Sequence, residues 1–231
     1  MIPFLLPTIA VLAFVPALFI LYQTLSEYTW PKSEVVYFED TWIFGLVAVG
    51  LILGAVLFFL DLLFSAGGFL ITVLFLAAEQ LVVLVILNFP KLRLKGATRF
   101  YGFSLGTAMS AGLIMGQYAE LFRYTPFDVR SFALLLIYSV GLELLGGSTG
   151  SIIGYAIERR LIPFGIAAAI ISQAAFGFLI IPVFSFAPSL LTMGFDAGAL
   201  LLSLLIYVYV MIRLLPQISA PAAEVRKKRL I

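Results

Sequence analysis

Three polar side chains stand in the middle of long apolar segments, where chemistry inside a membrane would require them. Glu79, Glu143 and Gln173 each lie midway along such a segment. A charged side chain at the centre of a bilayer costs about 2.5 to 3.5 kcal/mol on insertion scales, so such residues rarely face lipid. We therefore expect all three to point into the protein at a similar depth. Gln80 adjoins Glu79, and Gln117 lies nearer the outer side.

Neither glutamate has a basic residue at matching depth, because every Lys and Arg stands at a segment end or in a connection. Burial without a nearby cation disfavours the charged form of a carboxyl group. Glu79 and Glu143 are therefore expected to be largely neutral, or to bind a cation or a partner's charge. Two roles stay open, a structural hydrogen bond to Gln or Ser, and proton handling, ion binding or substrate contact.

Four more acidic residues fall at or near the outer ends of the apolar segments: Asp61, Glu120, Asp128 and Asp196. We expect these side chains to be solvated, or to form an acidic outer vestibule together. The stretch Gly194, Phe195 and Asp196 does not reproduce the Gly-x-Gly-Asp pattern of aspartyl intramembrane proteases. The last segment also has no lysine for a retinal Schiff base.

The chain has no cysteine and no histidine. This composition excludes disulfides, thiolate metal sites, iron–sulfur clusters and nucleophile pairs that use histidine, together with ordinary haem and zinc ligation. We therefore expect no catalytic residue, no metal site and no cofactor, and the sequence favours a protein that is not an enzyme. A nucleic-acid partner is not expected either, because no basic soluble face exists.

The residues that could do chemistry must be positioned by membrane-spanning helices. Of the 231 residues, 63% are hydrophobic and 11% charged, and the mean hydropathy is +1.15. About 20 apolar residues cross the hydrocarbon layer as a helix, so the chain has room for about seven spans and no soluble domain. The fold class is an all-α polytopic bundle in one domain, with these expected spans: 4–25, 41–63, 67–88, 99–122, 131–157, 161–185 and 195–215.

The positions of Lys and Arg predict the orientation of these spans. With seven spans, one side of the membrane receives 12 of the 14 positive residues, and only Arg123 and Arg130 fall on the other. The positive-inside rule places the N-terminus outside and the C-terminus, with a short basic tail over 216–231, in the cytoplasm. The compact chain favours a prokaryotic plasma membrane.

Small residues four positions apart mark the expected centre of the bundle. They are Gly102 and Gly106 in the fourth segment, and Gly146, Gly150 and Gly154 in the fifth. Such stripes let helix backbones approach closely, which drives packing where hydrophobicity does not. The run 146–151 contains three glycines and three hydroxyl residues, so it either unwinds to present its backbone or packs with hydroxyls bonded back to the helix.

Residues 77–155 resemble the glutamate/histidine intramembrane proteases that include PrsW and the CAAX-processing enzymes. The matching positions are Ala78, Glu79 and Gln80, where that superfamily has paired glutamates, then Tyr101, Gly102 and Gly106, and finally Gly154 and Tyr155. Gln80 replaces the second glutamate, Val83 stands where a basic residue would follow, and the histidines are missing. The resemblance implies a non-catalytic relative in which Glu79 is a remnant of the active site. The superfamily also contains the gamma-secretase scaffold subunit.

Three function hypotheses follow, and the third is a relative of the intramembrane proteases. The first is a non-enzymatic membrane subunit or scaffold, with the lipid bilayer and other membrane subunits as partners. It is based on the short loops, the missing catalytic chemistry and the glycine-rich segments. The alternative is a small proton- or ion-coupled transporter that uses the glutamates at mid-membrane depth.

Overall fold

The computed structural model describes residues 5–29, 32–33, 37–64, 68–93, 95–124, 129–185 and 190–217. These residues form helices and no strand, in the following order: α1 (Leu5–Ser26), α2 (Asp40–Phe64), α3 (Gly68–Leu87), α4 (Pro90–Arg93), α5 (Thr98–Tyr124), α6 (Val129–Arg159), α7 (Ile162–Ser185), α8 (Leu190–Tyr209) and the π-helix η2 (Val210–Leu214). The fold class predicted from composition, an all-α bundle, is confirmed. Most of the basic tail expected over 216–231 lies outside the described residues.

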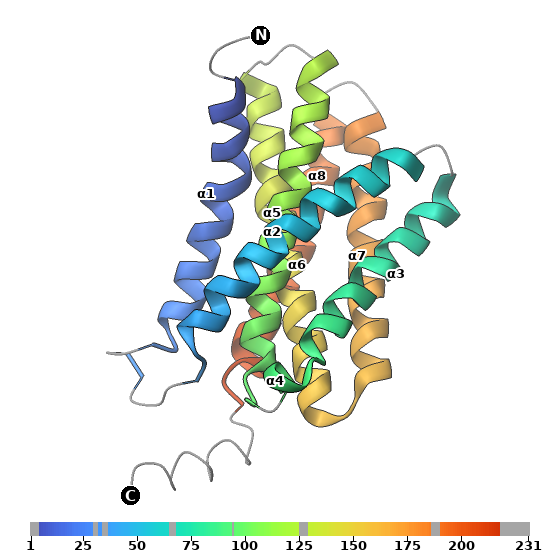
Figure 1. Ribbon diagram of the computed structural model, residues 1–231. Coiled ribbons are helices and arrows are strands. Elements are labelled where there is room, and N and C mark those ends of the chain that lie inside the picture. The colour runs from blue at the N-terminus through green and yellow to red at the C-terminus, as the bar shows by residue number, and fades with distance from the viewer. Residues whose placement is uncertain are drawn as a thin grey trace, which may run out of the picture.

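The seven long helices run alternately down and up the bundle, beginning with α1 at the top (Figure 1). Helices α5 and α6 lie at the centre, α2 crosses in front of them on a diagonal, and α3 runs on a diagonal in front of α7. Each expected apolar segment is helical and the boundaries agree within a few residues, except at α8. That helix begins at Leu190, five residues before the expected start.

Five helices are long and apolar enough to cross a membrane among the described residues: Leu6–Ser26, Asp40–Leu63, Phe132–Arg159, Ile162–Ile181 and Leu191–Leu214. This result indicates a membrane protein. Helix α5 is not among the five, and it is enclosed along its whole stretch from Phe100 to Gly112. A helix surrounded by protein needs small residues for close packing more than it needs an apolar surface.

The contact between α5 and α6 brings two backbones together. A methyl group added to Gly102 would overlap the carbonyl oxygen of Gly150, and one added to Gly106 would overlap that of Gly146. At Gly154, an added methyl group would overlap the carbonyl oxygen of Thr98. The glycines singled out in the sequence therefore lie at this contact, where each side has room for no side chain at all.

A second glycine contact joins α2 to the opposite side of α5. Gly54 packs against the backbone of Met109 and Gly112, and Gly50 packs against Leu105. Gly50 and Gly54 were not among the glycines predicted to pack, because their segment is apolar enough to face lipid. Helix α5 is thus held between two neighbours at backbone distance, which fixes the height of its polar residues relative to both.

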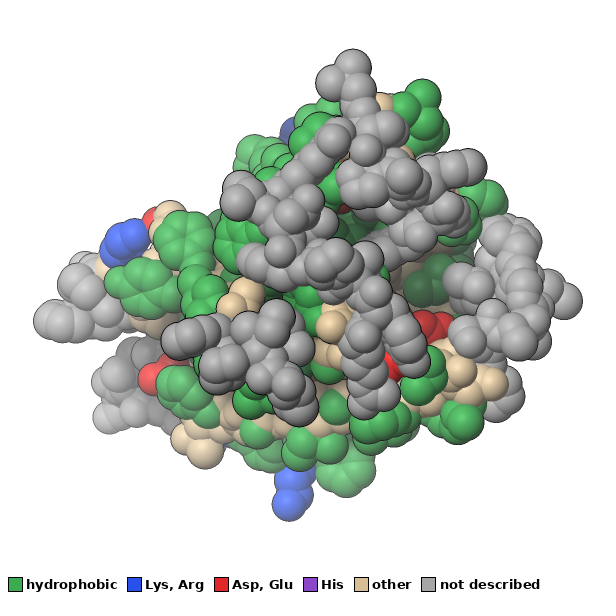
Figure 2. Space-filling model, turned by 90° about the horizontal axis from the view of Figure 1, so that it is seen from above, with side chains coloured by type: hydrophobic (Ala, Val, Ile, Leu, Met, Phe, Trp, Pro, Cys, Tyr) green, Lys and Arg blue, Asp and Glu red, His purple; other side chains and the backbone are tan. Residues whose placement is uncertain are grey.

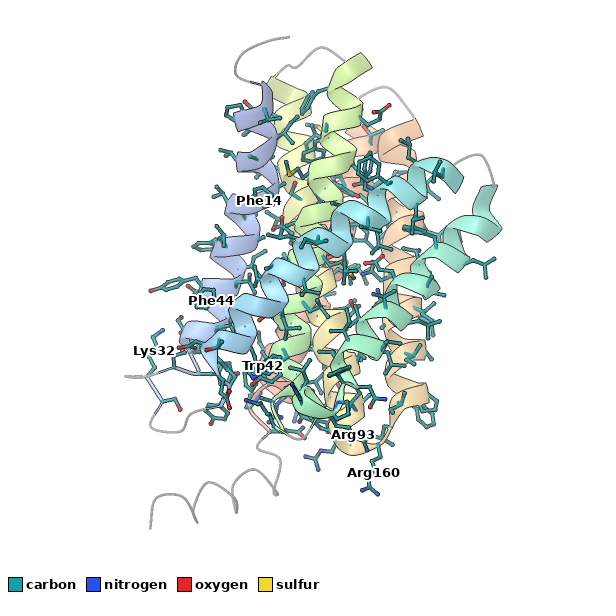
Figure 3. All side chains as sticks on the ribbon, viewed as in Figure 1. Phe14, Lys32, Trp42, Phe44, Arg93 and Arg160 are labelled. Atoms are coloured by element: carbon teal, nitrogen blue, oxygen red, sulfur yellow. The ribbon has the colours of Figure 1, made fainter. Side chains whose placement is uncertain are left out.

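The lower end of the bundle in the figures carries the basic side chains, including Lys32, Arg93 and Arg160 (Figure 3). Those three side chains are exposed, whereas Arg99, at the start of α5, is buried. Its Nη1 donates to the carbonyl oxygen of Leu214 at 3.0 Å, and its Nε lies 3.8 Å from a carboxylate oxygen of Glu158. Glu158 also accepts from the backbone N–H of Arg99 and the hydroxyl of Thr98. These bonds fasten α5, α6 and η2 together.

An aromatic cluster closes the same end beside α5. The ring of Tyr28 lies 5.0 Å from that of Phe100 and 5.4 Å from that of Tyr37, both in edge-to-face orientation. Such ring pairs contribute about 0.5–1.5 kcal/mol beyond their area burial. Burial raises the pKa of Tyr28 to about 12, so the phenol is neutral at ordinary pH.

Replacing Gly106 by alanine should lower the free energy of unfolding by roughly 1–3 kcal/mol, because the methyl group has no space at the helix contact. Gly45→Ala is the matched control, since nothing lies within 4 Å of a methyl group at that position. Thermal unfolding of both variants in detergent, followed by intrinsic fluorescence, measures the difference. Equal loss in the two variants would contradict the assigned contact.

The stability of the lower end should fall as the pH rises from about 10 to about 12. The unfolded chain loses the Tyr28 proton near its ordinary pKa of 10.0, whereas the folded chain keeps it to about 12, so rising pH favours unfolding. Tyr28→Phe removes this contribution. Melting temperatures of the two proteins should therefore converge or cross over this pH interval, and parallel curves would contradict the assignment.

Candidate functional site

Glu143 lies on the face of α6 that packs against α5. It precedes Gly146 by three residues and Gly150 by seven, so the three share one side of the helix. Gly146 packs on Gly106, and Gly150 packs on Gly102. The two helices are therefore antiparallel, and a step of four residues toward the C-terminus of α5 corresponds to a step of four residues toward the N-terminus of α6. This register places Glu143 opposite Ser110. The side chain is fully buried, and neither of its carboxyl oxygens has a hydrogen-bond partner.

Two hydroxyl groups on the side of α5 that faces α6 are also buried and without a hydrogen-bond partner among the described residues. The Oγ of Ser110 lies against Gly146 and the Oγ1 of Thr107 lies against Gly147, and both are buried without a hydrogen-bond partner. An interior that keeps three polar groups unpaired along one helix contact is uncommon, because buried polar groups are nearly always satisfied. We call Thr107, Ser110 and Glu143 the polar seam.

Two buried tyrosines stand above the polar seam. The hydroxyls of Tyr118 and Ser139 lie 2.7 Å apart and share the carbonyl oxygen of Leu135 as an acceptor. The hydroxyl of Tyr138 donates to Oε1 of Gln117 at 2.8 Å. The two rings pack at 6.3 Å between centroids, so the pair forms one connected group between α5 and α6.

Carboxyl groups from four helices converge on these two tyrosines. The charges of Asp61 on α2, Glu79 on α3 and Asp196 on α8 all act on the Tyr138 hydroxyl. Those of Glu143 and Asp196 act on the Tyr118 hydroxyl. The charge of Asp61 also acts on the Glu79 carboxyl. We call these four carboxyls and two tyrosines the acidic cluster.

The expectation that Asp196 is solvated near an outer helix end was wrong. Its side chain is 1% exposed, and neither carboxyl oxygen has a hydrogen-bond partner in the part of the chain that the structure describes. The error arose from the predicted start of the last span at residue 195. Because α8 begins at Leu190, Asp196 stands nearly two turns inside the helix, in the bundle interior.

The polar residues predicted at mid-depth are largely buried, as expected of groups that avoid lipid. Glu79, Gln80, Glu143 and Gln173 are buried, and Gln117 is partly so. No hydrogen bond joins any two of these five. The contact of a glutamate with Gln or Ser that the sequence offered as a structural role is thus not formed at Glu143. Gln80 Oε1 and Gln173 Nε2 have no partner either.

Asp61 and Glu120 are partly exposed near the upper end, and Asp128 lies outside the described residues. The structure thus adds Tyr118, Tyr138 and Asp196 to the candidate residues found in the sequence. A tyrosine inside an apolar segment was the available signal for the first two, because its hydroxyl needs a partner when buried.

Helix α6 continues without a break through the glycine-rich run 146–151. Ser148 donates to the carbonyl oxygen of Leu144 at 2.6 Å, and Ser151 donates to that of Arg99 at 2.9 Å. Of the two alternatives left open by the sequence, the run therefore packs rather than unwinds. The ligand-binding candidates in this helix are side chains and not exposed backbone.

No Lys or Arg is among the groups that act on Glu79, Glu143 or Asp196 in the described part of the chain. No three of its carboxyl groups are arranged to hold a metal ion. Single carboxyls with nearby hydroxyls have the chemistry to bind a proton or a cation of low charge, since both take oxygen ligands. Multidentate coordination of a divalent ion would need more ligands of this kind.

Comparisons of the chain with protein families, with curated proteins and with solved structures give no significant match. The resemblance of residues 77–155 to the glutamate/histidine intramembrane proteases therefore stays a prediction.

Glu143→Gln should leave the melting temperature unchanged or raise it, because the variant removes a buried titratable group that has no partner. Glu158→Gln is the contrast, since that carboxylate pairs with buried Arg99 and breaking such a pair costs roughly 3–5 kcal/mol. Thermal unfolding in detergent measures both. If Glu143→Gln lost as much stability as Glu158→Gln, a structural role for Glu143 would be the better interpretation.

Proposed function

We propose that this chain is a membrane transport protein that binds a proton or a small monovalent cation at Glu143 and the other carboxyls of the acidic cluster. The observation that supports this best is the burial of Glu143 and Asp196, whose four carboxyl oxygens have no hydrogen-bond partner among the described residues. An unsatisfied buried polar group costs about 1–3 kcal/mol, so a purely structural carboxyl would be hydrogen-bonded. Ionisable groups inside membrane bundles commonly mark paths of ions or protons.

Under this proposal the bundle crosses the membrane seven times. The five apolar helices form five of the spans, and α3 and α5 form the other two. The lower end, which carries Lys32, Arg93 and Arg160 (Figure 3), is then cytoplasmic under the positive-inside rule. The upper end is external, and α5 crosses the membrane enclosed by its neighbours. A prokaryotic plasma membrane is the expected location.

The chemistry of the cluster favours a ligand that carries one positive charge. Glu143 and Asp196 stand on different helices, and within the described residues neither is among the groups that act on the other. Each carboxyl therefore binds its ligand separately. A proton neutralises a carboxylate without further ligands, while a sodium-sized ion at Glu143 would recruit the hydroxyls of the polar seam. Both ligands remove the cost of a buried charge.

Glu143→Gln should reduce transport in proteoliposomes to the level of empty vesicles, because the amide neither releases a proton nor provides a charge for a cation. Proton flux is measured with a pH-sensitive dye under an imposed potassium diffusion potential, and sodium flux with the radioactive ion. Glu27→Gln is the matched control. Its carboxylate pairs with Lys32 on the surface at the lower end, so this variant should transport at the wild-type rate.

Unchanged flux in Glu143→Gln would reject Glu143 as the binding group. Absence of both fluxes from the wild-type protein would favour the second candidate, a non-enzymatic scaffold subunit. The observation that favours a scaffold subunit is that Glu79 and Glu143 are shielded from water. In that case, extraction in gentle detergent should recover the chain in a stoichiometric complex.

A further inference from the structure

Asp61 occupies the one position in the acidic cluster that is both partly exposed and close to a helix end. It lies three residues before the end of α2 at Phe64 and follows Gly54 by seven residues, so it continues the stripe of α2 that packs on α5. The exposed fractions of the other carboxyls are 5% at Glu79, 1% at Asp196 and 0% at Glu143. Exposure therefore falls steadily from Asp61 inward.

The register between α2 and α5 places Asp61 beside the tyrosines. Gly54 packs on Gly112, and Phe58 packs on Gly116. The two helices therefore advance together in the same direction, and Asp61 comes level with the turn that contains Gln117. Gln117 accepts the hydrogen bond of Tyr138, on whose hydroxyl the charge of Asp61 acts.

At the opposite end, the described residues of α5 and α6 are closely packed. Below Glu143, α5 and α6 meet backbone to backbone at Gly106 and Gly146. Below that contact, buried Arg99 is bonded to Leu214 and paired with Glu158. From above, acidic side chains are visible right of the centre of the view and also at its left rim, and the Lys and Arg side chains in view lie toward the rim (Figure 2).

From this arrangement we infer that Asp61 is the port through which protons enter the acidic cluster from the upper side, and that it passes them to Glu79. The inference rests on the proposed function and names its route of access. The O–H bond of the Asp61 carboxyl breaks and an O–H bond forms on the Glu79 carboxylate. The Asp61 carboxylate then takes a new proton from water at the upper surface.

Other titratable groups near this step are acidic or phenolic. The charge of Asp61 acts on Glu79 of α3 and on Tyr138 of α6, and Glu120 stands one turn beyond Gln117 on α5. No Lys or Arg is among the groups that act on the Asp61 or Glu79 carboxyl within the described residues.

The natural absence of cysteine allows the port to be located directly. Asp61→Cys in sealed, oriented vesicles should react with a membrane-impermeant maleimide from the external side. Glu143→Cys should react from neither side, and Glu27→Cys should react from the cytoplasmic side. Failure of the residue 61 thiol to react, or its reaction from the same side as the residue 27 thiol, would overturn the inference.

The transfer itself is tested by infrared spectroscopy of the full chain after a change to heavy water. The C=O stretch of the protonated Glu79 carboxyl, assigned by its loss in Glu79→Gln, should exchange about a hundredfold more slowly in Asp61→Asn, as expected when a positioned acid–base group is removed. Unchanged exchange would overturn the inference. Labelling and exchange need no transport, so their failure is distinguishable from unchanged flux in Glu143→Gln, which rejects the proposed function instead.

Discussion

The architecture depends on the backbone contact between α5 and α6. At Gly102 with Gly150, and at Gly106 with Gly146, the peptide groups of one helix fill the space where side chains of the other would stand. In a membrane, where apolar surface gains nothing by leaving lipid, such close contact is what holds helices together. The contact also fixes the register that sets Glu143 opposite Ser110 and brings Tyr118 level with Ser139.

This rigid contact explains how carboxyl groups remain buried without partners. The glycines hold the two helices at a separation that leaves no room for side chains to rearrange around Glu143, and no basic residue reaches its depth. The cost of burying these groups is met by the surrounding packing, as is common where strain or desolvation serves function. At the lower end the opposite solution applies, because Arg99 is buried together with its counter-charge.

Much of this could be predicted from the sequence, and the failures have identifiable causes. Apolar segments and glycine spacing predicted all seven long helices and the residues at the central contact, because both signals are local. Asp196 was misplaced, since no local pattern marks where α8 begins. Gly50 and Gly54 were missed because only the diagonal path of α2 brings them to α5. The convergence of Asp61, Glu79 and Asp196 on Tyr138 joins four helices, and no spacing in one chain encodes that.

The glycine contact also limits how this protein can change over evolutionary time. Gly102 and Gly106 on α5 are matched by Gly150 and Gly146 on α6, and an enlargement of any of the four is blocked by the peptide group opposite. No single substitution on one helix opens the space, so the two stripes must be inherited together. Distant relatives should thus be recognisable by the paired spacing of small residues in two adjacent helices, even where every carboxyl group has been replaced.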